Sequence, residues 1–369
     1  MRSAIVHDFF IQDGGAERCA VEFSRMLPEA GIFTTFFNSR RFRDRISPDR
    51  VHTWPLQRLI GPTERFRAFL PLYAAYFSSL RIPAAEFVLS SSSAFAKAVR
   101  TRPNAIHVSY VYTPMRYAWD LDTYFATSSY SSTTRMAGRL LRPFLRSWDR
   151  RTSRRPDHLV AISKVVQERI RTTWDRDAEL IYPPVDVGQI TVSTVDDGSY
   201  LVASRLLGYR RIDLVVRACT TLGRTLLVVG DGPERGRLEA MAGPTIRFAG
   251  RLSRAELVDA FQRCHAYVVP GVEDFGIAPV EAMAAGKPVI AFSGGGALET
   301  VLDGVTGVFF DDPQPDALAT AIGELEAMSF DPQAIRRQAE TFDLTVFHRR
   351  WRALFELVGI SPTLYSLPS

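Results

Sequence analysis

Short apolar runs alternate with helical patterns along most of the chain, and this alternation constrains the fold more than any other feature. In the first half the apolar runs are Ala4–His7, Phe87–Leu89, Ile106–Tyr112 and His158–Ile162. A strand that is buried on both faces reads as a continuous apolar run, whereas a half-exposed strand alternates with polar residues. The pattern therefore predicts an α/β fold with parallel sheets that helices cover on both faces.

The alternation breaks at Tyr182–Asp186, where two prolines precede a polar stretch that we interpret as a linker. A second series of predicted strands follows, at Tyr200–Ser204, Thr225–Val229, Ile246–Ala249, Ala266–Val269 and Pro288–Ala291. The length of 369 residues also favours two domains. We therefore predict two Rossmann-like, doubly wound domains that face each other across a cleft, where ligands bind beyond the carboxyl ends of the strands.

The predicted domain boundaries follow from this break. The N-terminal domain covers residues 1–185 and the C-terminal domain residues 186–343. A final helical pattern, about residues 344–369, is expected to pack back on the N-terminal domain. The two halves differ in charge, because residues 1–185 hold 28 Lys and Arg against 17 Asp and Glu, whereas residues 186–369 hold 17 against 23. This asymmetry predicts that the N-terminal half meets something anionic.

Several classes of protein are disfavoured by what the sequence lacks. The cysteines Cys19, Cys219 and Cys264 are odd in number and match no zinc or redox spacing, which favours a reduced cytoplasm. No apolar stretch is long enough for a membrane-spanning helix, and the N-terminus lacks the apolar core of a secretory signal. The six histidines form no metal-ligand spacing, and no Ser-His-Asp order stands out. We expect no metal and no cofactor.

The segment Glu273–Glu281 carries the sharpest chemical signal. It follows a predicted strand and contains Pro279, which suits the first turn of a helix because its missing N–H is not needed there. The amides of Gly276, Ile277 and Ala278 would then point out of the helix N-terminus and could bind a diphosphate. Glu281, in the first turn, could accept from ribose hydroxyls, and Glu273 could bind sugar hydroxyls. An acidic first turn that merely suits the helix dipole explains the carboxylates as well.

Other segments of the chain, taken with this one, resemble glycosyltransferase family 4. E-x7-E with an internal FGI, followed by EAMAAGKPVIA and GGGALETV, is similar to the donor-site signature of that family. Five further segments match the family in the expected order: GGAE at 14–17, TPMRYAWD at 113–120, AISKVVQERI at 161–170, IYPPVD at 181–186 and SRLLGYRRIDL at 204–214. Of these, TPMRYAWD and AISKVVQERI resemble segments of bacterial polysaccharide and O-antigen mannosyltransferases. The resemblance spans nearly the whole chain and implies the GT-B fold and a retaining reaction.

The resemblance also assigns residues. Arg205 and Arg210 would neutralise the donor diphosphate without a metal, with Glu273 as the third catalytic residue, although the family usually has Lys where this chain has Arg210. The donor would contact Gly14 and Gly15, and also Phe275, Gly276, Ile277, Ala278 and Glu281 in the segment described above. Surface arginines at the start of a solvated helix are the simpler explanation of Arg205 and Arg210.

A third group is expected to contact the acceptor or the sugar, namely Asp13, Tyr112 and Arg116. Relatives commonly carry His where this chain has Tyr112. A tyrosine cannot perform the same proton chemistry near neutral pH, because its ordinary pKa is about 10. An ordinary buried aromatic side chain explains Tyr112 equally well.

Arg135, Arg139, Arg142 and Arg146 repeat every three or four residues and predict a basic helical stripe, which Pro143 interrupts. Upstream, residues 56–80 are rich in Phe, Tyr and Leu. Such a stripe can lie on anionic lipid, so we expect peripheral contact with the inner face of the plasma membrane. A helix that packs on the sheet and exposes a solvated basic face is the alternative.

The resemblance implies transfer of a hexose, with mannose from GDP-mannose favoured, in surface polysaccharide or glycolipid assembly. A carbohydrate or polyprenyl-diphosphate-linked acceptor would suit the basic N-terminal half. A UDP-sugar donor and a GT-B nucleotide-sugar epimerase remain alternatives. A glycogen phosphorylase-like enzyme would need a pyridoxal lysine, and Lys287 lacks that context. A basic nucleic-acid-binding protein is the remote alternative, because no nucleic-acid module is visible, and we expect no nucleic-acid partner.

Overall fold

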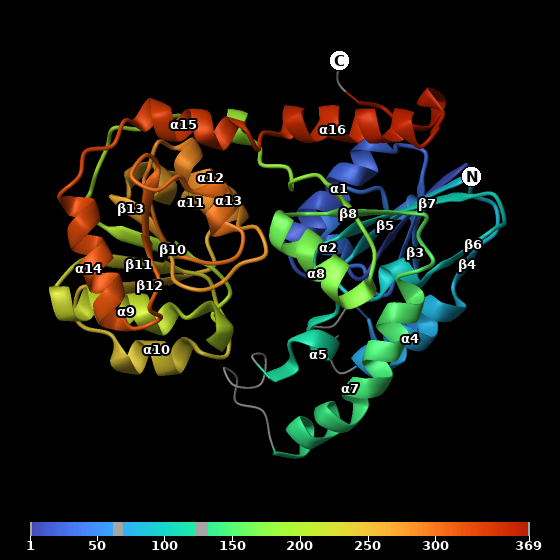
Figure 1. Ribbon diagram of the computed structural model, residues 1–369, viewed down its shortest axis with the longest axis horizontal. Helices are drawn as coiled ribbons and strands as arrows, with labels where there is room; N and C mark the ends of the chain where they lie inside the picture. The colour runs from blue at the N-terminus through green and yellow to red at the C-terminus, as the bar shows by residue number, and fades with distance from the viewer. Residues whose placement is uncertain (1, 62–68, 123–131, 368–369) are drawn as a thin grey trace. The chain divides into compact units, whose positions relative to one another are not determined.

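The computed structural model describes residues 2–61, 69–122 and 132–367 (Figure 1). The chain separates into two compact units. Unit 1 comprises Met1–Leu121, Ser131–Pro183 and Phe347–Ser369, and unit 2 comprises Asp122–Tyr130 and Pro184–Val346. Each unit is built on its own parallel sheet, so the predicted α/β class is confirmed.

The sheet of unit 1 has the strand order β3-β2-β1-β5-β7-β8-β9, and every neighbouring pair is parallel. Its strands are β1 Ser3–His7, β2 Gly31–Thr34, β3 Val51–Thr53, β5 Phe87–Ser92, β7 Ile106–Val111, β8 His158–Ala161 and β9 Glu179–Leu180, while β4 Arg81–Ile82 pairs separately with β6 Arg100–Thr101. The central strands are buried on both faces, as their apolar sequences require.

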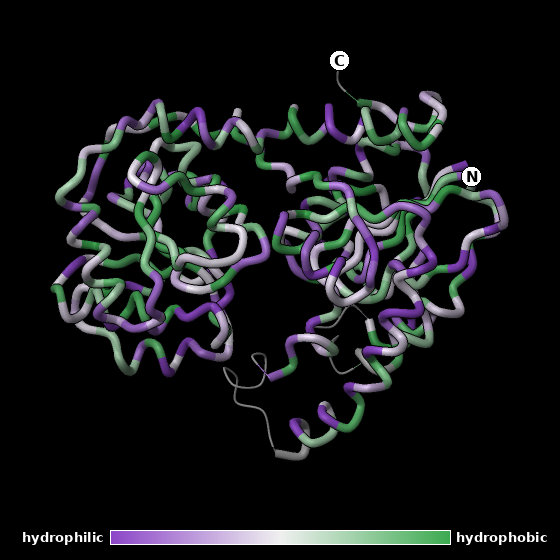
Figure 2. Tube along the Cα trace, viewed as in Figure 1, coloured by the Kyte–Doolittle hydropathy of each residue, from purple (hydrophilic) through white to green (hydrophobic). Residues whose placement is uncertain are grey.

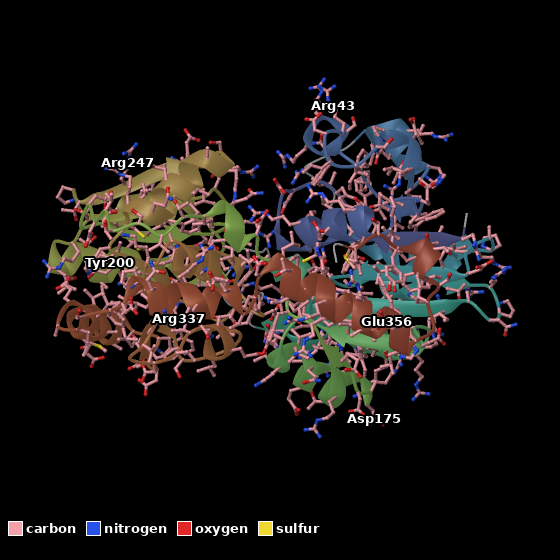
Figure 3. All side chains as sticks on the ribbon, turned by 90° about the horizontal axis from the view of Figure 1, so that it is seen from above. Arg43, Asp175, Tyr200, Arg247, Arg337 and Glu356 are labelled. Atoms are coloured by element: carbon pink, nitrogen blue, oxygen red, sulfur yellow. The ribbon has the colours of Figure 1, made fainter. Side chains whose placement is uncertain are left out.

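Helices cover both faces of this sheet and connect its strands. The helices and 3-10 turns of unit 1 are α1 Gly15–Met26, α2 Ser39–Phe42, η1 Pro48–Arg50, α3 Leu56–Ile60, α4 Leu70–Ser79, η3 Ala96–Ala98, α5 Arg116–Trp119, α7 Ser132–Thr152 and α8 Lys164–Trp174. The helix α16, Leu344–Leu357, lies over α1 (Figures 1 and 3), where the His348 imidazole contacts the Glu22 carboxylate at 2.7 Å.

The predicted basic helix is present as α7, and it continues through Pro143. Proline removes one helical hydrogen bond, but Pro143 is exposed, so water can satisfy the carbonyl that loses its donor. Hydrophobic and hydrophilic residues alternate along α7 (Figure 2). Its second half is held to unit 1 by Trp148 and Asp149, which are buried.

The sheet of unit 2 has the strand order β12-β11-β10-β13-β14-β15, again entirely parallel. Its strands are β10 Tyr200–Ala203, β11 Leu226–Val229, β12 Ile246–Gly250, β13 Ala266–Val269, β14 Val289–Phe292 and β15 Gly307–Phe310. Its helices and 3-10 turns are η4 Val187–Gln189, η5 Gly208–Arg210, α9 Ile212–Leu222, α10 Arg235–Met241, α11 Arg254–Arg263, α12 Ile277–Ala284, α13 Ala297–Thr300, α14 Pro315–Glu326 and α15 Pro332–Glu340. The core packs strand residues such as Val202 and Val228 against Leu214 and Leu318 of the helices.

The sequence patterns located most of these strands but missed β2, β3, β9 and β15 of the two main sheets, and the separate pair β4 and β6. All six are two to four residues long. Runs of that length cannot be assigned to strand, helix or loop by periodicity alone, so tertiary pairing decides them.

Candidate active site

The strand order of the unit 2 sheet creates one position where neighbouring loops leave in opposite directions. β10 and β13 are adjacent, yet the chain continues from β10 to β11 on one side and from β13 to β14 on the other. Open parallel sheets bind ligands at such a switch point, beyond the carboxyl ends of the strands. The loop after β10 carries Arg205 and Arg210, and the loop after β13 carries Glu273.

Arg210 and Glu273 form an ion pair at this switch point, between guanidinium Nη1 and carboxylate Oε1, and their side chains are 21% and 23% exposed. Burial alone would lower the pKa of Arg210, but the Glu273 carboxylate outweighs burial and raises it, so the guanidinium stays charged. Its Nε is buried and has no hydrogen-bond partner among the described residues. The pair thus holds a cation, with a spare donor, in a fixed place.

Tyr209 lies between the two arginines of this loop. The Arg210 guanidinium lies 5.2 Å from the centre of the Tyr209 ring, and Arg205 Nη2 lies 3.5 Å from the Tyr209 hydroxyl. A Cβ on Gly271 would come within 3.0 Å of the Tyr209 and Arg210 carbonyls, so the loops after β10 and β13 touch backbone to backbone. Arg205 and Arg210 therefore both contact the Tyr209 side chain, and Gly271 lets their loop approach the loop that carries Glu273.

A second glycine contact fixes the loop that carries Glu273. The Gly296 amide donates to the Glu273 carbonyl at 2.8 Å. Gly295 has φ +66°, and a Cβ there would lie 2.3 Å from the Glu273 carbonyl oxygen; one on Gly296 would lie 2.4 Å from Phe275 Cα. Only glycine permits this approach. These two positions were recognised in the sequence only as part of the family signature, and their packing role was missed.

The N-terminus of α12 presents free amides, as expected. Gly276 is the N-cap residue with φ +90° and has no side-chain cap, and Pro279 lies in the first turn. In the described part of the chain, the amides of Ile277 and Ala278 donate no hydrogen bond. Unpaired amides at a helix N-terminus attract anions, so this end of α12 can hold a phosphate.

Two residues of the same segment lie elsewhere than the sequence predicted. Glu281 was expected in the first turn of the helix but lies in the second, because the helix begins at Ile277. It is 3% exposed, and its Oε1 accepts from Arg254 Nη1 at 2.6 Å. Phe275 is 3% exposed and packs edge-on against Phe342 with centroids 5.5 Å apart, so its side chain supports the loop.

Unit 1 has a corresponding switch point between β1 and β5. Asp8 lies there, and it was not among the site residues predicted from the sequence. The Asp8 carboxylate is 1% exposed and accepts hydrogen bonds from four consecutive amides, those of residues 93–96, at 2.6–3.0 Å. Burial raises the pKa of Asp8, while the amides and Lys97 oppose that effect. Asp8 therefore fixes the loop after β5 and has no capacity left for a ligand.

A chain of hydrogen bonds connects three more strand-end residues of unit 1 to the first turn of α1. His7 Nδ1 lies 3.0 Å from Ser91 Oγ, which lies 2.8 Å from the Tyr112 hydroxyl. That hydroxyl also donates to the Ala16 carbonyl at 2.9 Å. Burial raises the pKa of Tyr112 well above its ordinary value and lowers the pKa of His7 to about 4, so both are neutral near pH 7. Tyr112 links β7 to α1.

Of the remaining predicted residues of unit 1, Gly14 and Gly15 lie at the same turn. Gly14 is the N-cap residue of α1, its amide donates to Glu17 Oε2 at 3.2 Å, and Gly15 is the first helical residue. Asp13 is partly exposed and pairs with Arg45 at 3.0 Å. Arg116 begins α5 and is partly exposed. Gly14, Gly15 and Tyr112 are thus close together through Ala16, whereas Asp13 is engaged with Arg45.

The described residues contain neither a metal-binding cluster nor a membrane-spanning helix. No group of three or more His, Cys, Asp or Glu side chains there could hold a metal ion. None of the helices in the described ranges combines the length and apolarity that a membrane span requires.

Two family models match the chain in succession. The model described as Glycosyltransferase Family 4 matches residues 13–189, and the model described as Glycosyl transferases group 1 matches residues 189–342. Among curated relatives, the GDP-mannose-dependent alpha-(1-6)-phosphatidylinositol monomannoside mannosyltransferase of Mycolicibacterium smegmatis is 35% identical over 34% of this chain and 37% of its own. The D-inositol 3-phosphate glycosyltransferase of Mycolicibacterium gilvum is 30% identical over 44% of this chain and 41% of its own. These alignments span less than half of either relative.

Solved structures match over the whole chain. The complex of Anabaena HepE with UDP-glucose superposes with a TM-score of 0.70 at 17% identity, covering 96% of this chain and 100% of that chain. The sucrose-phosphate synthase of Thermosynechococcus elongatus gives a TM-score of 0.70 at 16% identity, covering 98% and 100%. At this identity the likeness shows the fold alone, and the fold is GT-B.

The chain is thus a GT-B protein with a charged site at the switch point of its second sheet. It belongs to glycosyltransferase family 4, as the resemblance implied.

Proposed function

We propose that the protein is a retaining glycosyltransferase that moves a hexose, mannose from GDP-mannose, onto a lipid-linked oligosaccharide acceptor. The Arg210–Glu273 pair beside the amino end of α12 carries the donor half of this proposal. The name of the M. smegmatis relative supports GDP-mannose. The HepE complexes with UDP and UDP-glucose keep UDP-sugars as the second donor class.

The donor diphosphate would be neutralised by protein cations and amides in place of a metal. Arg205 and Arg210 supply two guanidinium groups, which can bind phosphate oxygens in bidentate fashion. The free amides of Ile277 and Ala278 add a helix N-terminus. Together they stabilise the charge that grows on the diphosphate as its bond to the sugar breaks, which is the step that limits such a reaction.

The proposed reaction needs no protein base. The acceptor hydroxyl attacks the anomeric carbon on the side of the leaving group, and the nucleoside diphosphate departs as the C–O bond to the sugar breaks. A phosphate oxygen of the leaving group takes the hydroxyl proton, so protons and charge balance. Glu273, oriented by Arg210, would bind sugar hydroxyls, and Glu281 would bind the ribose after exchanging its contact with Arg254.

The acceptor half of the proposal places the enzyme on the inner face of the plasma membrane. Four apolar side chains of α7 are largely exposed: Met136 56%, Leu140 74%, Leu141 48% and Phe144 62%. Leu59 of α3 is 83% exposed as well. Exposed apolar helix faces of this kind insert into the boundary of a lipid bilayer. Residues 62–68 of the segment 56–80, which include Arg65 and Arg67, lie outside the described residues.

A comparison of products tests the function and its alternatives. The enzyme is incubated with GDP-mannose, UDP-glucose or UDP-N-acetylglucosamine, with and without a bacterial lipid extract, and the products are separated by chromatography. We expect sugar in the lipid fraction with one donor, dependent on the extract and unchanged by EDTA. Conversion of the donor to its epimer without an acceptor would identify an epimerase, and strict dependence on Mg²⁺ or Mn²⁺ would contradict the metal-free mechanism.

Vesicle flotation tests the membrane contact separately. The double variant Leu140→Glu/Phe144→Glu should float with anionic vesicles far less than the wild type, because both side chains leave the apolar face. A variant of an exposed residue in unit 2, Leu298→Glu, serves as the matched control. Equal flotation of all three proteins would contradict insertion of α7.

A further inference from the structure

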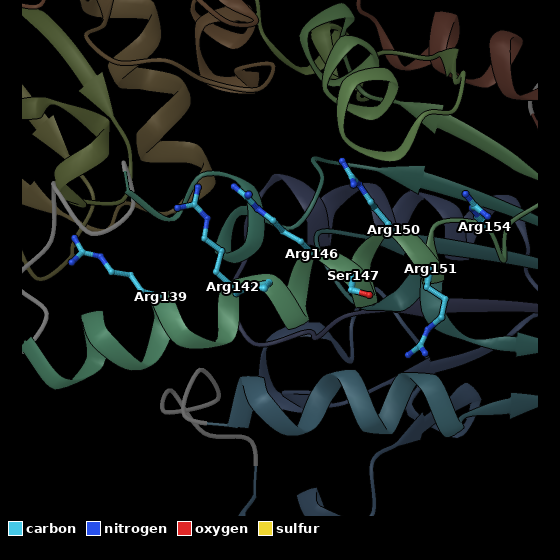
Figure 4. A pocket seen from close by; sticks show the side chains of 8 residues that line it. Arg139, Arg142, Arg146, Ser147, Arg150, Arg151 and Arg154 are labelled. Atoms are coloured by element: carbon cyan, nitrogen blue, oxygen red, sulfur yellow. The ribbon is translucent and has the colours of Figure 1, made fainter.

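Six arginines, five of them on α7, line a hollow of about 670 Å³ (Figure 4). The lining side chains are Arg139, Arg142, Pro143, Arg146, Ser147, Arg150, Arg151 and Arg154. At about 100° per residue, Arg146 and Arg150 lie roughly 120–160° around the helix from Phe144. These two arginines therefore lie on another side of the helix than Phe144.

Two of the arginines are held by a ring that is itself anchored in the core. The guanidinium groups of Arg146 and Arg150 lie 5.1 Å and 5.0 Å from the centre of the Trp119 ring. Trp119 Nε1 donates at 2.8 Å to Asp149 Oδ2, and Asp149 is 0% exposed and paired with Lys97. A cation that is stacked in this way loses less side-chain freedom when it binds an anion.

Backbone contacts fix the same two guanidinium groups through one nitrogen each. Arg146 Nε donates to the Ala118 carbonyl at 2.9 Å, and Arg150 Nε donates to the Thr173 carbonyl at 2.8 Å. The terminal Nη groups of these two side chains make no hydrogen bond within the described parts of the chain. A pair of such groups, four residues apart on one helix, can bind adjacent phosphate groups.

Most of the charges of this hollow have no carboxylate partner among the described residues. Among the described residues, no carboxylate lies within ion-pair distance of Arg139, Arg146, Arg150, Arg151 or Arg154. Like charges three or four residues apart destabilise a helix. An anion from outside the chain would remove this repulsion, and the spacing suits several phosphate oxygens.

We propose that Arg146 and Arg150, stacked on Trp119, bind the diphosphate group of a lipid-linked acceptor. This inference rests on the proposed function and deepens it, because it assigns the acceptor's anionic group to a site on unit 1. Arg139 and Arg142 extend the hollow along α7 into the part of the helix that exposes Leu140 and Phe144. The apolar tail of the acceptor stays with the lipid while its diphosphate enters the hollow.

Binding of short diphosphates to the intact protein, measured by calorimetry at low salt, tests the inference. Farnesyl diphosphate and inorganic pyrophosphate should bind the wild type more tightly than farnesyl monophosphate. The variant Arg146→Gln/Arg150→Gln should bind both diphosphates about tenfold more weakly or worse, because two charged hydrogen-bond donors are lost. Arg217→Gln removes one positive charge from the exposed face of α9 and should leave the affinity unchanged.

Because Arg146 also contacts the Ala118 carbonyl, the single variant Arg150→Gln and the melting temperature of each protein accompany the double variant. The inference is overturned if a stably folded double variant binds farnesyl diphosphate as the wild type does, or if Arg217→Gln loses as much affinity. Tighter binding of a single-stranded oligonucleotide or of anionic vesicles than of farnesyl diphosphate at this site would overturn it as well. No sugar transfer is measured, so a failure of the proposed transferase activity would not affect this result.

Discussion

The two sheets of the molecule use the polar groups at their carboxyl edges in different ways. In unit 1, Asp8 is saturated by four backbone amides, and His7, Ser91 and Tyr112 bond to one another and to Ala16. In unit 2, Arg210 and Glu273 are partly exposed, and the Nε of Arg210 has no partner within the described ranges. At the edge of the unit 1 sheet, the polar groups bind one another and fix the loops, whereas the edge of the unit 2 sheet keeps a charged pair that a ligand can reach.

This difference suggests why the cations of unit 1 gather on a helix surface and not at the sheet. Asp8 and the Tyr112 hydroxyl are engaged in hydrogen bonds within unit 1, so neither side chain offers a free donor to an anion. The buried Lys97–Asp149 pair instead anchors α7, whose arginines line an open hollow. Rigidity and binding are therefore separated in unit 1 and combined at the switch point of unit 2.

Breaking the buried anchor of unit 1 should have the largest effect. Lys97→Met leaves Asp149 charged and buried, with two indole N–H donors but without its cation. Removing one partner of a buried pair costs about 3–5 kcal/mol of unfolding free energy, which urea titration will measure. Arg171→Gln breaks an exposed pair with Glu168 and should leave the midpoint unchanged. An equally small effect of Lys97→Met would show that Asp149 is not held by this charge.

The charged pair of unit 2 should matter for turnover more than for stability. Arg210→Ala removes the cation beside the proposed diphosphate, and we expect kcat/KM for transfer to fall by about 2–4 kcal/mol in transition-state stabilisation. Arg205→Lys keeps its charge and should lose less than Arg205→Ala. Steady-state kinetics measure both, and wild-type kcat/KM in Arg210→Ala would remove Arg210 from the mechanism.

Two glycines have nearly the same φ angle but different surroundings. Comparing their alanine variants therefore distinguishes the cost of a steric clash from the cost of backbone strain. Gly295 has φ +66° and Gly223 has φ +64°, but only at Gly295 would a Cβ collide with another segment, the Glu273 carbonyl. Gly223→Ala should cost about 1–2 kcal/mol through its left-handed backbone, and Gly295→Ala about 1–3 kcal/mol more through the clash. Chemical unfolding of both variants measures the difference. Equal costs would mean that the Glu273 loop adapts freely.

Near neutral pH, the pH dependence of stability should be the smallest of these effects, and it arises in unit 1. Burial, with Arg155 and Arg176 nearby, lowers the pKa of His107 to about 3. Below about pH 6.5, His107 binds a proton in the unfolded chain but stays neutral in the folded chain. The free energy of unfolding therefore falls as the pH drops from about 6.5 toward 3. The slope approaches about 1.4 kcal/mol per pH unit for one histidine. His107→Gln should flatten the curve there and run parallel to the wild type above pH 7; an unchanged slope would contradict this assignment.

The sequence could predict the alternating strands because burial on both faces leaves a local signature. It also identified Arg210 and Glu273 separately, each by the loop in which it lies. Their pairing was not predictable, because it depends on β10 and β13 being neighbours, which only the strand order decides. The role of Gly295 was hidden for the same reason, since its contact lies in another loop.

Errors in the sequence-based site had local causes. Glu281 was placed one turn too early because the exact first residue of a helix is poorly specified by its sequence. Asp8 was not selected because an acidic residue after a strand is typical of a solvated loop, and nothing local indicates four amides around it. The hydrogen bonds of the Tyr112 hydroxyl to Ser91 and Ala16 were not predictable, because they join residues that are distant in the sequence.

Nucleotide binding to unit 2 tests the central claim most directly. The melting temperature of the wild type and of Arg210→Ala is measured with GDP, UDP and ADP, each without metal. We predict that one nucleotide, GDP, stabilises the wild type by about 2.7 kcal/mol at a concentration of 100 Kd and thereby raises its melting temperature. Arg210→Ala should lose most of this rise. No shift with any nucleotide, or an equal shift in Arg210→Ala, would contradict a donor site at the Arg210–Glu273 pair.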